Sequence, residues 1–225
     1  MKKQIFTAFL AFCLLCPRCY AAGAEKYVAL TFDDGPSGRF TRRLLEGLEE
    51  RGVRATFLLC GYRLKDYPET ARLIRDGGHE IGLHGYSHKN MSKMNLQDVE
   101  RELADTRALL PEGCRPVFFR PPGGAVSPAV TEGARRAGVA VLGWSVDPRD
   151  WEIHDAGAVE AAVLGDVEDG DLILLHDLCD SSVDAALAIV DKLTEWGFRV
   201  VTVSELARIR GVTPQPGQTY CAFPG

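Results

Sequence analysis

The sequence predicts an α/β fold, a single domain built around a parallel sheet. Seven short apolar runs alternate with amphipathic segments along the chain. Most of these runs are continuous rather than alternating, which is typical of strands covered on both faces. An open doubly wound sheet and a closed, incomplete barrel both fit this pattern. The chain has no G-x-G-x-x-G segment and no P-loop, so nothing supports dinucleotide or nucleoside triphosphate binding.

The apolar patterns predict where each helix and strand lies. Helices are expected between the strands because apolar side chains recur at helical spacing, as in Asn95–Leu110. Two further apolar faces consist of Phe40, Leu44, Leu45 and Leu48, and of Val183, Leu187, Val190 and Leu193. The expected strands are Tyr27–Phe32, Ala55–Cys60, Glu80–Leu83, Val117–Phe119, Val139–Val146, Leu172–Leu175 and Arg199–Val203.

Residues 1–24 have the layout of a secretory signal peptide. Lys2 and Lys3 precede an apolar run, Ile5–Cys16, that is shorter than a bilayer span of about 20 residues. A cleavage site of the A-x-A type follows and ends at Ala24. An uncleaved anchor is the alternative. Cleavage leaves 201 of the 225 residues, which divide into a domain over 25–210 and a tail over 211–225.

Composition excludes several classes of protein. With 46% hydrophobic and 25% charged residues, the chain is of the ordinary globular type. The leader carries three basic residues and no acidic ones, so its loss changes the formal net charge from -5 to -8. An acidic chain without a Lys/Arg run or a basic amphipathic stretch favours neither nucleic acid nor a membrane surface. We therefore expect an exported protein, secreted or in the cell envelope, without a stable membrane anchor once the leader is cleaved.

Polar side chains follow five of the predicted strands, at the point where each strand ends. Because the carboxyl ends of parallel strands open on one face, these side chains are expected to meet there. Each alone has an ordinary explanation, such as a turn, a core histidine or an ion pair, but their coincidence favours a functional site. His79 precedes its strand and His154 lies in a loop, so both are interpreted as structural or surface residues. The candidate residues are Asp33, Asp34, His84, His88, Arg120, Asp147, Asp150 and His176.

These residue types indicate metal-assisted hydrolysis. Two histidines and one carboxylate are a common ligand set for a zinc-type ion, with positions left open for water and substrate. A metal lowers the pKa of bound water, and a neighbouring carboxylate can complete the deprotonation. His176 could protonate a leaving group, with Asp150 or Asp147 fixing the tautomer of its ring.

Five motifs occur in a characteristic order. They are Thr31–Pro36 (TFDDGP), His84–His88 (H-x-x-x-H), Arg120–Gly124 (RPPGG), Asp147–Trp151 (D-x-x-D-W) and Leu174–His176 (L-x-H). Together they resemble the motifs of the polysaccharide deacetylases, the NodB-homology group that forms carbohydrate esterase family four. The similarity extends from about Val28 to Leu206, nearly all of the mature chain.

The resemblance implies a distorted (β/α)7 barrel with parallel strands. It also implies metal-dependent removal of acetyl groups from N-acetylated sugars, with one divalent ion that is usually zinc. The partner would be cell-wall peptidoglycan or another N-acetylglucosamine polymer. An O-acetyl esterase acting on acetylxylan, and a carbohydrate-binding protein without activity, are the alternatives. The resemblance implies that Asp33 is the general base and that Arg120 orients it. Asp34, His84 and His88 would be the metal ligands. His176 would be the general acid, and Asp150 would adjust its pKa.

The sequence departs from the family pattern at two positions, one in the substrate pocket and one in the metal loop. The resemblance assigns Trp151 and Leu174 to an acetyl-methyl pocket and a backbone N–H near Gly123 to the oxyanion. Gly123 stands where a Tyr is common, which removes an aromatic wall of the cleft. Gly85 stands where Thr or Ser is usual, which removes a hydroxyl from the metal loop.

Four of the seven cysteines remain once the leader is removed, an even number that permits disulfides outside the cytosol. Cys60 and Cys179 are expected on the site face, and Cys114 and Cys221 on the opposite face. Because bridged Cα atoms lie within about 7 Å, the expected pairs are Cys60–Cys179 and Cys114–Cys221. Four unpaired thiols are the alternative.

Overall fold

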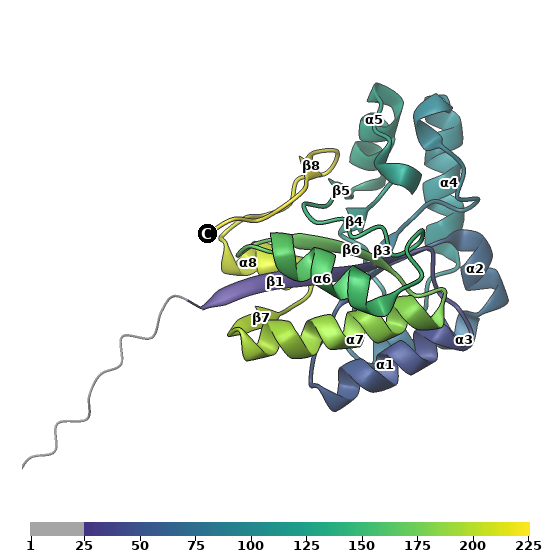
Figure 1. Cartoon of the computed structure of the whole chain (residues 1–225). Coiled ribbons are helices and arrows are strands. Elements are labelled where there is room, and N and C mark those ends of the chain that lie inside the picture. Colours follow the sequence, from purple (N-terminus) through teal and green to yellow (C-terminus); the bar gives the residue numbers. More distant parts are fainter. Residues whose placement is uncertain (1–24) are drawn as a thin grey trace, which may run out of the picture.

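A curled sheet of parallel strands forms the centre of the protein. The computed structural model describes residues 25–225, and the expected leader lies outside them. Within this range the strands follow the order β6-β1-β2-β3-β4-β5-β8, and β7 pairs with the start of β1 (Figure 1). The strands are β1 (Lys26–Asp33), β2 (Thr56–Leu59), β3 (Glu80–Leu83), β4 (Phe118–Phe119), β5 (Ala140–Leu142), β6 (Leu172–His176), β7 (Phe198–Val200) and β8 (Thr219–Tyr220).

The two halves of the sheet meet after β5. Val146 forms a parallel bridge with Ile173 of β6, and the Leu174 N–H donates to the Val146 carbonyl at 2.9 Å. The sheet therefore curls into a half-barrel. This confirms the expected distorted barrel and excludes the open doubly wound alternative.

Two predicted strands are shorter than expected. β5 ends at Leu142, and the chain then changes partners, because the N–H groups of Ser145 and Val146 bond to Leu172 of β6. The last predicted strand stops early because the Thr202 side chain accepts from the Glu205 N–H and so begins a helix. The first strand is therefore ended by bonds to a distant strand, and the second by a local helix cap.

Helices cover the outer side of the curl (Figure 1). α1 and α7 run along one part of it and pack on residues such as Leu30, Phe32 and Ile173. α4 and α5 lie side by side over the β3–β5 part, against Leu83 and Phe119. The α-helices are α1 (Phe40–Glu50), α2 (Gly61–Asp66), α3 (Pro68–Asp76), α4 (Leu96–Ala108), α5 (Pro128–Ala137), α6 (Ala156–Asp166), α7 (Asp180–Glu195) and α8 (Val203–Ile209), and the 3-10 turns are η1 (Met91–Lys93) and η2 (Pro122–Gly124).

The inner side of the curl has its own apolar cluster. Alternate residues of each strand point inward, so Ala29 of β1 and Leu172 of β6 belong to this cluster while their neighbours belong to the outer one. α8 contributes Val203 and Leu206 at the amino-terminal end of the strands. The carboxyl-terminal end of the inner side is left to polar residues.

The chain end extends the sheet. The sequence-based division treats residues 211–225 as a tail, and within it β8 pairs with β5 in parallel. Phe223 is buried at 2% exposure and joins the inner cluster, and its N–H donates to the Gly170 carbonyl. Residues 219–223 are therefore part of the packed structure.

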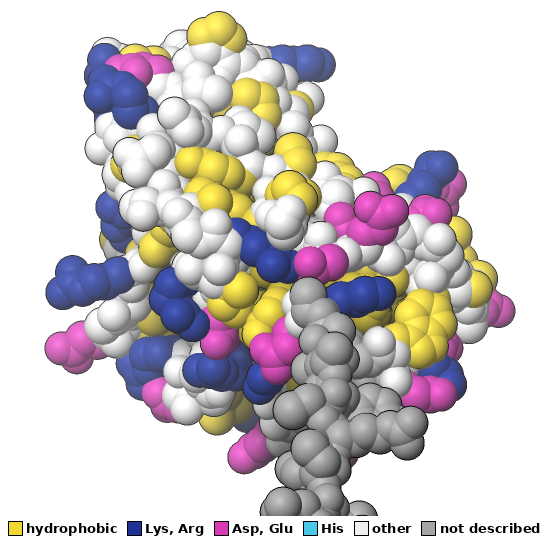
Figure 2. Space-filling view, turned by 90° about the vertical axis from the view of Figure 1, so that its left-hand side faces the viewer, with side chains coloured by type: hydrophobic (Ala, Val, Ile, Leu, Met, Phe, Trp, Pro, Cys, Tyr) yellow, Lys and Arg dark blue, Asp and Glu magenta, His cyan; other side chains and the backbone are white. Residues whose placement is uncertain are grey.

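The surface shows no separation of charge on the face that bears the start of β1. Figure 2 shows acidic and basic side chains interspersed there. Ion pairs join several of them, including Arg199 with Glu25 and Arg210 with Asp169. Among the helices of residues 25–225, none is long and apolar enough to cross a bilayer.

Candidate active site

Strand alternation brings the predicted residues to the inner side of the curl. Asp33 continues the inward series of Ala29 and Thr31 on β1, and it lies in register with His176 at the end of β6. Arg120 follows Phe118 in the same way, two positions beyond an inward residue of β4. The site residues therefore come together because of the strand register and because every second residue of a strand points inward.

Arg120 is fully buried and organises the floor of the site. One guanidinium nitrogen, Nη1, donates to Asp33 Oδ1 at 2.7 Å and to the Thr31 hydroxyl at 2.8 Å. The other, Nη2, donates to the Gly143 carbonyl at 2.7 Å, and the guanidinium lies 5.5 Å from the Trp144 ring. Because Arg is always charged, this arrangement fixes an ionised carboxylate in one orientation.

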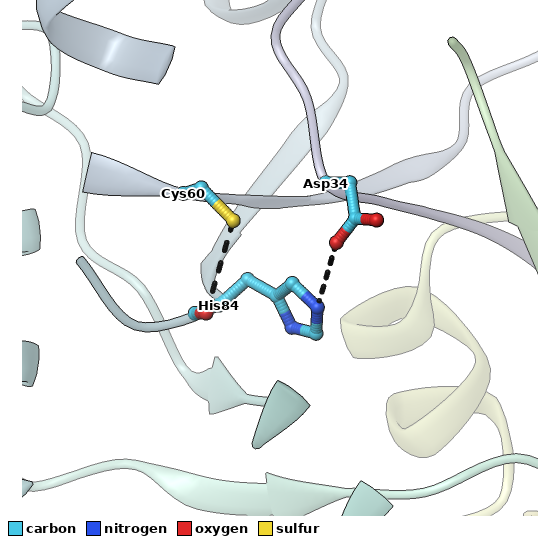
Figure 3. A group of neighbouring side chains, drawn as sticks. All are labelled: Asp34, Cys60 and His84. Carbon is cyan, nitrogen blue, oxygen red and sulfur yellow. Dashed lines mark hydrogen bonds and ion pairs between the residues drawn. The ribbon is translucent and has the colours of Figure 1, made fainter. Parts of the chain in front are cut away.

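Asp34, His84 and His88 converge on one point. Asp34 Oδ1 lies 3.1 Å from His84 Nε2 and 2.8 Å from His88 Nε2, and Figure 3 shows the first of these contacts. His84 Nδ1 lies 2.7 Å from the Arg120 carbonyl, which can only accept, so Nδ1 carries the proton. In the neutral ring, the Nε2 lone pair then faces a carboxylate lone pair. A cation between them removes this repulsion, so the three residues fit a divalent metal ion.

The carboxyl and the two imidazoles also influence one another's ionisation. Burial opposes ionisation of Asp34, but the two imidazoles beside it hold the pKa of its carboxyl well below its usual range. The pKa of His88 is raised by its contact with Asp34. Asp34 and His88 also have positive φ angles of 70° and 57°, a conformation that costs a non-glycine residue about 1–2 kcal/mol. Such strain is found mainly at functional sites.

Cys60, which the sequence places on the site face but without a role, lies beside this group. Its Sγ atom and ligand atoms of Asp34 and His84 all lie within 4.8 Å of one another. Figure 3 shows the thiol directed at the His84 carbonyl, 3.9 Å away. Cys60 lies two positions beyond Leu58, an inward residue of β2, so strand alternation predicts that its side chain points to the inner side. Burial raises the pKa of the thiol, so Cys60 is a neutral thiol when no cation lies beside it.

His176 is held by Asp150. Its Nδ1 donates to Asp150 Oδ1 at 2.8 Å, and its backbone N–H donates to Oδ2 at 2.9 Å. Burial disfavours the charged ring, but the hydrogen bond and charge of fully buried Asp150 raise the pKa of His176 to about 9. The other acid considered, Asp147, is exposed and accepts from the Arg149 N–H in a turn. The partner of His176 is therefore Asp150.

The expected pocket residues differ in exposure. Leu174 is buried two residues before His176, and Trp151 is exposed at 55%. Gly123 has a φ of 65°, and nothing lies within 4 Å of the position where its Cβ would be. At Gly124 a Cβ would lie 2.5 Å from the Trp144 ring, so this glycine is required for close packing. Trp144 thus supplies an aromatic surface beside the turn that lacks a Tyr.

Neither expected disulfide is present. Cys60, Cys114, Cys179 and Cys221 are all unpaired. Cys114 precedes β4, but Cys221 directly follows β8, which runs parallel to β5, so the two cysteines belong to opposite ends of the sheet. The Cys114–Cys221 pairing is therefore wrong.

The Cys60–Cys179 bond is not formed in the structure either, and each thiol has another neighbour. The Cys60 thiol is directed at the His84 carbonyl. Cys179 begins α7, where its Sγ lies 3.2 Å from the hydroxyls of Ser181 and Ser182.

Two carboxylates near the site were not assigned a role from the sequence. Asp177 is fully buried, and burial raises its pKa to about 6. It accepts from the Thr41 hydroxyl, and a Cβ at Gly35 would lie 2.9 Å from it, which explains the glycine after the two aspartates. Glu102 on α4 bonds to the loop between the two histidines. Asp177 follows a strand end, as the predicted residues do, whereas Glu102 had no sequence signal because it reaches the loop from the middle of a helix.

The two other histidines lie outside the site residues. His79 Nδ1 accepts from the Ala55 N–H, its ring meets Phe57 edge-on, and burial lowers its pKa to about 4. It is a neutral structural residue. His154 is exposed.

A curled parallel α/β sheet with carboxylates, imidazoles and a buried Arg at its carboxyl end defines a class of hydrolytic enzymes that use a divalent cation. Comparison with known proteins narrows this class. The family model for polysaccharide deacetylases matches residues 21–142. The chain belongs to the polysaccharide deacetylase family.

Relatives and solved structures agree with this assignment. The chain is 35% identical over 188 residues to the peptidoglycan-N-acetylmuramic acid deacetylase PdaC of Bacillus subtilis, covering 83% of this chain and 40% of that protein. It is 36% identical over 192 residues to a peptidoglycan-N-acetylglucosamine deacetylase of Bacillus cereus, covering 83% of this chain and 90% of that protein. A family 4 acetyl xylan esterase from Clostridium thermocellum, solved with a cobalt ion, superposes with a TM-score of 0.83 at 34% identity, covering 89% of this chain and 100% of that one.

Proposed function

We propose that the protein is an exported, metal-dependent polysaccharide deacetylase that removes acetyl groups from N-acetylated sugars of a cell-wall or extracellular polymer. The observation that carries this proposal is the convergence of Asp33, the Asp34–His84–His88 group and His176 on one inner surface. The identity to peptidoglycan deacetylases supports peptidoglycan or a related N-acetylglucosamine polymer as substrate.

Asp34, His84 and His88 would hold the metal ion. One carboxylate oxygen and two imidazole nitrogens match the ligand set of catalytic zinc sites, which leaves open positions. We propose zinc because imidazole suits it well, and the ion would supply Lewis-acid polarisation of the acetyl carbonyl and of water. Cys60 would stay outside this set as a neutral thiol.

Asp33 would act as general base. Its Oδ1 is engaged by Arg120, and its Oδ2 lies 3.7 Å from His84 Nε2, beside the proposed ligands. One oxygen is therefore fixed and the other is free to take a proton from the attacking water. Arg120 would keep that oxygen in place without touching substrate.

His176 would act as general acid. With Nδ1 bonded to Asp150, its Nε2 is the nitrogen available to a substrate. Because its pKa is raised to about 9, the ring is protonated at neutral pH and can donate to the departing sugar amine. Trp151 and Leu174 would enclose the acetyl methyl, and the backbone N–H near Gly123 would stabilise the oxyanion.

An O-acetyl esterase is the second candidate, because the chain superposes on an acetyl xylan esterase as described above. The same residues would cleave an ester, since an oxyanion forms in both reactions. The residues that disfavour a purely carbohydrate-binding protein are Asp33 and His176, which are both present and positioned.

Acetate release from a panel of polymers tests the proposal. Zinc-loaded protein is expected to release acetate from peptidoglycan, chitin oligomers or poly-N-acetylglucosamine. Release from acetylxylan alone would favour the esterase. If zinc-loaded protein releases acetate from none of these substrates, the deacetylase proposal is wrong.

Export rests on the layout of residues 1–24. The basic start, the apolar run and the A-x-A site support cleavage after Ala24. A polymer of the cell wall is accessible only to an exported enzyme, so the two proposals are consistent with each other.

A further inference from the structure

We propose that Glu102, on α4, is a positioning residue that holds the loop His84–His88 in its metal-binding conformation. This inference rests on the proposed metal site and adds a residue outside the five motifs. The loop contains two of the three proposed ligands, so the spacing between their rings depends on the backbone of the three residues between them.

The contacts are three hydrogen bonds to one carboxylate. The backbone N–H groups of Tyr86 and Ser87 both donate to Glu102 Oε2 at 2.7 Å. The Ser87 hydroxyl donates to Glu102 Oε1 at 2.7 Å. Bonds to a charged acceptor are among the strongest hydrogen bonds in proteins. A single side chain therefore fixes two consecutive peptide groups immediately before His88.

Other groups hold the opposite side of the loop. The N–H groups of Gly61 and Tyr62, at the start of α2, donate to the carbonyls of Gly85 and Tyr86 at 3.0 Å. The carbonyls of the loop thus have backbone partners, while the amides of its second half depend on Glu102. Without Glu102 these amides would lack a protein acceptor.

Gly85 gives the loop a backbone conformation that other residues rarely adopt. Its φ is +75°, and a Cβ there would lie 3.1 Å from Met91 Sδ and in ordinary contact, at 3.4 Å, with Glu102 Oε2. The glycine therefore sets the turn of the loop, and the Glu102 carboxylate binds the amides that follow it.

The charge of Glu102 is directed at the loop. Among the ion pairs of residues 25–225, Asp98 of α4 pairs with Arg101 and Glu100 pairs with Arg136, whereas Glu102 and Asp105 have no ion-pair partner. α4 is itself fixed, because Val99 and Leu103 are buried against the sheet. The carboxylate is therefore presented by a rigid element.

Zinc affinity of the metal-stripped full-length mature protein tests the proposal. Substitution of residues that orient metal ligands typically weakens binding about 10- to 100-fold, and we expect a loss in this range for Glu102→Ala. Glu102→Gln keeps one acceptor oxygen but no charge, so its loss should be smaller. Glu100→Ala, at a half-buried residue of the same helix whose carboxylate pairs with Arg136, is the matched control and should bind zinc like the unchanged protein.

The measurement is competition with a chromophoric zinc chelator, together with thermal unfolding in the presence of a chelator to show that each variant is folded. A folded Glu102→Ala variant that loses less than tenfold in affinity would overturn the proposal. If this variant does not fold, Glu102→Gln decides, with a loss above threefold supporting the proposal and a smaller one overturning it. Because no acetate is measured, the result is independent of whether the protein is a deacetylase.

Discussion

Asp150 determines the charge of His176, so its substitution should change the pH dependence of acetate release. In Asp150→Asn the burial that lowers the pKa of His176 remains, while the charge that raises it is lost. His176 should then lose its proton at a lower pH than in the unchanged protein, where its pKa is about 9. The alkaline limb of the pH profile for acetate release is expected to move toward lower pH.

Stability gives an independent check of the same residue. A His pKa raised from 6.5 to about 9 contributes stability that is fully present below pH 6.5 and is lost as the pH rises through 9. Asp150→Asn should reduce the stability that is present at low pH and flatten this dependence in urea unfolding. An alkaline limb that stays in place would contradict the assignment of Asp150.

The residues that could be predicted from the sequence are those at strand ends. Asp33, His84, Arg120 and His176 are predictable because parallel strands share one open end and alternation turns these positions inward. Glu102 is not predictable, because it reaches the site from the middle of a helix.

At the level of elements, β8 and the residues after it close the edge beyond β5. Phe223→Ala removes a fully packed ring from the inner cluster, for which we expect a loss of about 3–5 kcal/mol in the free energy of unfolding. Val126→Ala, at a position that is 45% exposed, is the control and should change stability by no more than about 0.5 kcal/mol. Urea unfolding of both variants checks this. Equal stability of the two variants would mean that the chain end does not contribute to the fold.

The elements found from the sequence are those with long periodic patterns. The strand of Tyr27–Phe32 and the helix of Asn95–Leu110 agree with β1 and α4 to within a few residues. β8 has only two residues and no apolar run, so it carries no pattern. β5 was expected to be longer because the apolar run continues after the strand has changed partners.

For the whole molecule, the described residues 25–225 form one curled α/β sheet with its helices and a short packed chain end. The intact mass of the exported protein is expected to correspond to residues 25–225. Denaturing alkylation without reductant should modify four thiols, because none of the four cysteines is paired. A mass lower by two hydrogens for each disulfide, or a retained leader, would contradict this account.

In the proposed mechanism a base and a metal site act together at the end of β1. Asp33→Asn tests this most directly, because Asn keeps an acceptor for Arg120 but cannot take a proton. We expect unchanged zinc content and a loss of acetate release of about 100- to 10,000-fold, the usual contribution of general base catalysis. Acetate release at the original rate, or loss of the zinc, would contradict it.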